Sequence, residues 1–180
     1  MLLIEIPPGE FWDELKHEFV YTPKQTLQME HSLVSLSKWE SKWNKAFLSK
    51  REKTTEEIMD YIQCMTLTPG VAPEVYASLT RENIDQIQRY ISAPMTATVI
   101  PQDKGGGNSR ETVTAELIYW WMITLQIPFE CQYWHLNRLL ALVRVCNVKN
   151  SPPKKTSKRE LASRYAAQNA ANRRRLGSRG

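Results

Sequence analysis

The segment TAELIYWWM, residues 114–122, decides the fold class of this chain, because its apolar side chains follow one another with little polar interruption. Thr114 is a typical N-cap residue, so a helix is expected to begin directly after it. A helix that is apolar nearly all round is usually central to a core. Core packing is therefore preferred to base stacking for Trp120 and Trp121, since no Lys or Arg lies between the aromatic residues.

A longer helix is predicted after Pro128, over about residues 129–147. Within it, Cys131 and His135 have the i, i+4 spacing that can place two metal ligands on one helix face. No second pair has a compatible spacing, so a packed thiol and a hydrogen-bonded histidine are expected rather than a metal site. The expected inward-facing residues are Trp134, Leu136, Leu139, Leu140, Val143 and Cys146.

Three helices are predicted upstream of this region from N-cap residues followed by apolar residues at helical spacing. Ser37 and Thr54 each begin a capping box, with Glu three residues later, and Thr80 marks a third helix start. The expected buried residues of the three helices are Trp39, Trp43 and Phe47; Ile58, Tyr61, Ile62 and Met65; and Ile84, Ile87 and Ile91.

The N-terminal region mixes two periodicities. Residues 2–6 predict a short strand, and residues 10–19 predict a helix from the spacing of Phe11, Trp12, Leu15 and Phe19. From Thr26 an alternation of apolar residues predicts a second strand, in which His31 is a core histidine. Residues 95–100 could form another strand, and residues 101–110 predict a flexible loop without a phosphate-binding motif. The fold class is therefore mainly α with a few short β-strands.

Charge is unevenly distributed along the chain. Residues 144–180 carry eleven of the 24 Lys and Arg residues but only one acid, Glu160, whereas residues 1–143 have an excess of acids. Pro152 and Pro153 indicate a linker, and Ser157 begins a capping box that opens a basic, Ala-rich helix. We expect a compact, mostly helical domain over residues 1–150 and a basic linker and helix over residues 151–180.

The basic tail is the candidate binding site. Docking on an acidic protein surface is its favoured role, with phosphate contact to nucleic acid as an alternative and a solubilising end as a third. The candidate partner-binding residues are Lys154, Lys155, Lys158, Arg159, Arg164, Arg173, Arg174 and Arg175.

The remaining composition favours a binding protein over an enzyme. No catalytic constellation is evident, and no cofactor or metal is expected. Three cysteines without a CxxC pair favour a reducing compartment. No signal peptide and no membrane span are expected, which predicts a cytoplasmic protein; an oligomer is compatible with the sequence.

Three blocks of the chain, residues 30–49, 116–148 and 164–180, resemble small proteins of long-tailed bacteriophages, most closely the tail assembly chaperones. The blocks cover about two-fifths of the chain and contain no functional motif, so no site residue is carried over. The resemblance implies a non-enzymatic helper in the host cytoplasm. Such proteins bind the tape measure protein and keep it soluble while tail tube subunits assemble around it.

Two alternatives follow for the function. One is a structural virion component, such as a tail or head–tail connector protein, whose basic tail docks on neighbouring subunits; it would be found in the virion. The other is a small accessory protein that binds nucleic acid through the basic tail.

Overall fold

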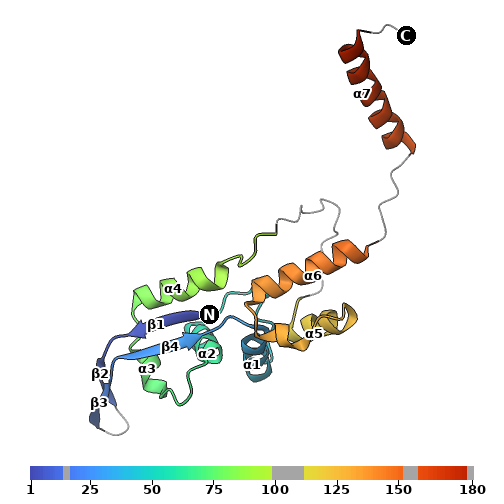
Figure 1. Cartoon of the computed structure of the whole chain (residues 1–180). Coiled ribbons are helices and arrows are strands. Elements are labelled where there is room, and N and C mark those ends of the chain that lie inside the picture. Colours follow the sequence, from blue (N-terminus) through green and yellow to red (C-terminus); the bar gives the residue numbers. More distant parts are fainter. Residues whose placement is uncertain (14–16, 99–111, 152–157, 178–180) are drawn as a thin grey trace. The chain divides into compact units, whose positions relative to one another are not determined.

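The computed structural model describes residues 1–13, 17–98, 112–151 and 158–177. The chain falls into two units, Met1–Lys149 and Asn150–Gly180. The first unit, called the body below, contains two small antiparallel sheets and a set of helices (Figure 1). The prediction of a mainly α-helical protein with a few short strands is confirmed.

The four strands of the described residues form two sheets of two strands each. The second sheet is a hairpin that lies, in sequence, between the two strands of the first. β1 (Leu2–Ile6) pairs with β4 (Gln25–Met29), and β2 (Gly9–Asp13) pairs with β3 (Glu18–Thr22), both antiparallel (Figure 1). The predicted strand over residues 2–6 is confirmed, and the alternation that begins at Thr26 ends at Met29. His31 and Leu33, which lie beyond it, are nevertheless buried.

The predicted helix over residues 10–19 is wrong. In the hairpin, Trp12 lies opposite Phe19 and their rings meet edge to face, with centroids 5.0 Å apart. A cross-strand aromatic pair of this kind stabilises a hairpin, and it replaces the helical contacts that the same spacing suggested. Leu15 lies outside the described residues.

The helices occupy most of the remaining chain. Their bounds are α1 (Leu33–Trp43), α2 (Thr55–Met65), α3 (Pro73–Ala77), α4 (Arg81–Ser92), α5 (Ala115–Thr124), the 3₁₀ helix η1 (Phe129–Tyr133), α6 (Leu136–Asn150) and α7 (Lys158–Leu176). Residues 95–98 have no regular structure, and residues 99–111, which include the predicted loop, lie outside the described residues.

Three of the predicted helix starts are confirmed. Thr54, Thr80 and Thr114 are N-cap residues whose side chains accept hydrogen bonds from backbone N–H groups of the first turn. The start at Ser37 is wrong, because Ser32 caps α1 and forms a capping box with Ser35 instead of Glu. α1 then ends at Asn44, a left-handed C-cap, so Phe47 lies beyond the helix.

The predicted helix over residues 129–147 is divided in two. η1 ends at Tyr133, Trp134 is extended, and α6 begins at Leu136. The break arises where the chain pairs with the segment before α1: Ser32 and His135 form a β-bridge, and the Leu136 N–H donates to the His31 carbonyl at 2.6 Å.

Two buried clusters form the core of the body. The first packs β1 and β4 against α1, α2, α3 and α4, and the second packs α1 against α5, η1 and α6. α1 contributes Trp39 to the first cluster and Leu33 and Leu36 to the second. Ile58, which was predicted to face inward, is 37% exposed at the surface of α2.

Glu40 of α1 ties three segments together in the interior. One carboxylate oxygen accepts a hydrogen bond from the Phe47 N–H at 2.8 Å, and the other accepts from the Ala115 N–H at 2.7 Å. Burial raises the pKa of Glu40, and the two backbone hydrogen bonds act in the opposite direction. The carboxylate therefore joins α1 to the first residue of α5.

Glu57 holds a second charged cluster. Its carboxylate accepts hydrogen bonds from Arg51 and Lys45, each at 2.8 Å, and from the Thr54 N–H at 3.0 Å. These contacts, the Arg51 hydrogen bond foremost, lower the pKa of Glu57 to about 2. The segment between α1 and α2 is thereby fastened to the start of α2.

The base of the hairpin lies against α3 at Gly9. The Gly9 N–H donates to Thr22 Oγ1 at 3.1 Å, and that hydroxyl lies 2.9 Å from the hydroxyl of Ser78. A Cβ atom on Gly9 would lie 2.3 Å from Ser78 Oγ, which is closer than atoms can approach. A larger residue at this position would therefore have to displace the Ser78 side chain or the backbone.

We expect Gly9→Ala to lower the free energy of unfolding by about 2 kcal/mol, because overpacking a close contact displaces the backbone. Chemical denaturation followed by tryptophan fluorescence measures the change. Ser78→Gly removes the obstructing side chain, so the Gly9→Ala/Ser78→Gly double variant should be no less stable than Ser78→Gly alone. A full loss in the double variant would contradict the steric explanation.

Candidate partner-binding surfaces

α5 presents one buried and one exposed face. Ala115, Ile118 and Met122 are fully buried in the second cluster, whereas Trp120 and Ile123 are 58% and 61% exposed. The prediction that the whole helix is central to the core is therefore wrong. The second cluster covers the face of α5 that contains residues 115, 118 and 122, and Tyr119 and Trp121 pack partly against it, whereas Trp120 and Ile123 are left open.

η1 extends this exposed apolar region. Phe129 and Tyr133 are 53% and 64% exposed. Tyr119 of α5 links the two helices, because its hydroxyl donates to Gln132 Oε1 at 2.9 Å and its ring lies 6.5 Å from that of Phe129. We call Trp120, Ile123, Phe129 and Tyr133 the α5–η1 surface. Exposed apolar side chains on neighbouring elements are typical of protein interaction sites when they form one patch.

The signal for this surface was present in the sequence. Glu116 precedes Trp120 by four residues, which places both on the same side of a helix that begins after Thr114. Glu116 is exposed in the structure. The polar residue thus marks the outward face, whereas the number of apolar neighbours suggested complete burial.

The predicted partner-binding residues lie on or before α7. Lys154 and Lys155, together with the predicted cap Ser157, lie outside the described residues, and Lys158 and Arg159 form the first turn of α7. The remaining four, which are all exposed, are Arg164, Arg173, Arg174 and Arg175.

The four arginines of α7 whose side chains are described do not form one continuous stripe. Arg164 and Arg173 are separated by about 14 Å along the helix axis, at 1.5 Å per residue. Arg173, Arg174 and Arg175 are consecutive, so they point about 100° apart around the axis. They occupy the last turn, where positive charge favours the helix by opposing its dipole. α7 therefore offers a basic end rather than a continuous basic face.

α7 also has no buried side chain among residues 162–177. Two large apolar residues among these, Tyr165 and Leu176, are 61% and 72% exposed. Most of the stability of a helix in a protein comes from packing of one face against a neighbour, and residues 162–177 have no such buried face. A partner that covered one side of α7 would therefore stabilise it.

His31 and His135 are buried and form hydrogen bonds in the interior of the body. His31 Nδ1 lies 2.6 Å from the Tyr61 hydroxyl, and its ring meets that of His135 edge to face, with centroids 5.1 Å apart. The Asn137 N–H donates to His135 Nδ1, so His135 Nε2 carries the proton and donates to the Tyr90 carbonyl at 3.0 Å. The prediction that His31 is a core histidine is confirmed.

Cys131 and His135 do not share an α-helical turn. Cys131 lies in η1 with its thiol buried, and burial raises the pKa of that thiol. The expected packed thiol and hydrogen-bonded histidine are thus confirmed. In the described part of the chain, no group of three or more His, Cys, Asp or Glu side chains could hold a metal ion.

Comparison with models of known protein families, with curated proteins and with solved structures finds no match to this chain. Among the described residues, no helix is both long enough and apolar enough to cross a membrane.

Proposed function

We propose that this protein is a non-enzymatic assembly chaperone or adaptor of a long-tailed bacteriophage, which binds the tape measure protein or tail tube subunits during tail assembly. One observation carries the proposal: Trp120 and Ile123 lie on the outward face of α5, about one helical turn apart, and more than half of each is exposed. Anchors at this spacing suit the apolar face of a partner helix. The resemblance of three sequence blocks to tail assembly chaperones supports the same function.

The binding is non-covalent and reversible in this proposal. An amphipathic partner helix packs its apolar residues against the α5–η1 surface, which removes those residues from water and suppresses aggregation of the partner. The basic end of α7 contacts acidic stretches of the same partner, and α7 gains stability as it is covered.

Co-expression with the tape measure protein of the same phage tests this function. We expect the soluble fraction of the tape measure protein to rise several-fold with the wild-type protein. The rise should be lost with Trp120→Ser/Ile123→Ser, because burial of two large side chains contributes several kcal/mol of interface free energy. Leu67→Ser is the matched control, since Leu67 is 53% exposed and lies beside β4, where its N–H donates to the Gln28 carbonyl. No rise with the wild-type protein would show that the proposal is wrong.

Two further outcomes distinguish the alternatives. Stoichiometric amounts of the protein in purified particles would favour a structural virion component over a chaperone. Binding to duplex DNA that falls steeply with salt, and that is lost when residues 151–180 are deleted, would favour a nucleic-acid-binding role.

A further inference from the structure

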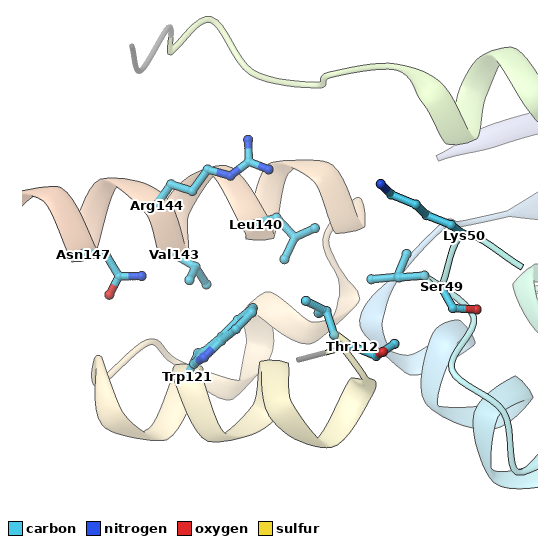
Figure 2. A pocket seen from close by; sticks show the side chains of 10 residues that line it. Ser49, Lys50, Thr112, Trp121, Leu140, Val143, Arg144 and Asn147 are labelled. Atoms are coloured by element: carbon cyan, nitrogen blue, oxygen red, sulfur yellow. The ribbon is translucent and has the colours of Figure 1, made fainter. Parts of the chain in front are cut away.

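A pocket of about 600 Å³ opens in the body where α5 and α6 approach the segment after α1. Its walls are apolar: Trp121 comes from α5, Leu140 and Val143 come from α6, and Leu48 and Val113 complete the lining (Figure 2). The pocket is separate from the outward face of α5, because Trp121 lines it and Trp120 does not.

Two positively charged side chains lie at the rim of this pocket. Arg144 of α6 and Lys50 lie on the same side, with Leu140 between them, and Trp121 lies across from them (Figure 2). Both charged residues are exposed, and neither forms an ion pair with another described residue. The pocket therefore combines an apolar interior with positive charge at one edge.

The placement of the polar groups indicates what kind of ligand fits. Small-molecule sites usually direct a few buried polar groups at the ligand. Here Lys50, Thr112, Arg144 and Asn147 are all exposed at the rim, and the hydroxyl of Ser49 already donates to the Ala46 carbonyl at 2.8 Å. An apolar interior with a charged rim is instead the usual form of an anchor pocket in a protein interface.

We propose that this pocket binds an acidic, apolar segment of the partner protein, with a leucine or phenylalanine side chain inside and a neighbouring carboxylate against Lys50 and Arg144. This inference rests on the proposed function, and it specifies which kind of segment of the partner protein is bound. Opposite charge at the rim fixes the orientation of the segment, while burial against Trp121 and Leu140 supplies the affinity. An uncharged apolar segment fills the same volume but leaves both cations without a partner.

A peptide titration tests the pocket without the partner protein. The probe is acetyl-Glu-Leu-Phe-Glu-amide, and its neutral counterpart is acetyl-Gln-Leu-Phe-Gln-amide. Binding to the full chain is followed by NMR through the indole N–H signal of Trp121, which is assigned by its disappearance in Trp121→Phe. Short peptides of this kind bind with dissociation constants of about 1 mM or weaker, a range that NMR measures well.

We expect the acidic peptide to shift the Trp121 signal and to bind about 5-fold more tightly than the neutral one. Lys50→Gln/Arg144→Gln should weaken the acidic peptide by about 5-fold and leave the neutral peptide unchanged, since each exposed charge contributes only a modest attraction. Lys149→Gln removes an exposed charge of α6 outside the pocket and is the matched control. Because all of these side chains are exposed, the variants keep the fold.

Equal binding of the two peptides, or no shift of the Trp121 signal, would overturn the inference. The Lys50→Gln/Arg144→Gln variant in the co-expression assay separates this result from failure of the proposed function. If the wild-type protein and this variant solubilise the tape measure protein equally well, the pocket proposal is wrong and the proposed function stands. If the variant solubilises markedly less, the pocket is part of the binding site.

Discussion

Glu40→Leu should lower the free energy of unfolding of the body by about 3 kcal/mol, although leucine is similar in size to glutamate and apolar. The N–H groups of Phe47 and Ala115 both donate to this carboxylate. Without it, each loses its acceptor, and an unsatisfied buried polar group costs about 1–3 kcal/mol. Removal of a buried charge offsets part of this loss.

Glu40→Gln gives a graded test of the same explanation. The amide oxygen of the new glutamine still accepts a hydrogen bond from one of the two N–H groups, but its amide nitrogen faces the other N–H donor. We therefore expect the free energy of unfolding to fall by about 2 kcal/mol. Urea denaturation followed by tryptophan fluorescence measures both variants. Glu52→Gln is the matched control, because Glu52 is exposed in the segment before α2 and should change stability by less than about 0.5 kcal/mol. Wild-type stability of Glu40→Leu would show that α1 and α5 are not joined through this side chain.

Acid should destabilise the body well before most carboxylates are protonated. Burial, together with the neighbouring His135, lowers the pKa of His31 from 6.5 to about 3. The pKa of His135 is also lowered, mainly by burial. As the pH falls below 6.5, the unfolded chain takes up a proton at His31 and the folded chain does not. Stability is therefore complete above about pH 6.5 and is lost progressively as the pH falls towards 3.

The slope for His31 approaches about 1.4 kcal/mol per pH unit as the pH falls below 6.5, and it is best measured between pH 6.5 and 5, above the titration of most carboxyl groups. The groups that face the two histidines are Tyr61, Tyr90, Glu30 and the N-terminal amine, which forms an ion pair with Glu30. His31→Gln should flatten the dependence of unfolding free energy on pH in this window. His17→Gln should leave it unchanged, since His17 is exposed. Equal slopes in the wild type and His31→Gln would contradict this origin.

The sequence predicted those parts of the fold that local chemistry determines. Thr54, Thr80 and Thr114 satisfy backbone groups within one turn, so the helix starts could be recognised without knowledge of the rest of the chain. The hairpin over residues 9–22 could not, because the pairing of Trp12 with Phe19 is a contact between strands. The break between η1 and α6 likewise depends on the distant pairing of Ser32 with His135.

The candidate binding surfaces, too, were predicted where the local sequence determines them and missed where distant contacts do. The basic character of α7 is a property of composition and was predicted, whereas the dispersal of its arginines around the axis follows from helix geometry. The exposure of Trp120 depends on which face of α5 meets α1 and α6. The pocket at Trp121 was not predicted, since Lys50 and Arg144 are almost a hundred residues apart in the chain.

Because α1 contributes buried residues to both clusters, it affects how the body unfolds. Trp39 lies in one buried cluster, and Leu33 and Leu36, from the same helix, lie in the other. Loss of α1 would expose the interior of both clusters at once, so neither can open fully while the other remains intact. The two clusters therefore behave as a single cooperative unit, and a ligand that protects one of them slows amide hydrogen exchange in the other.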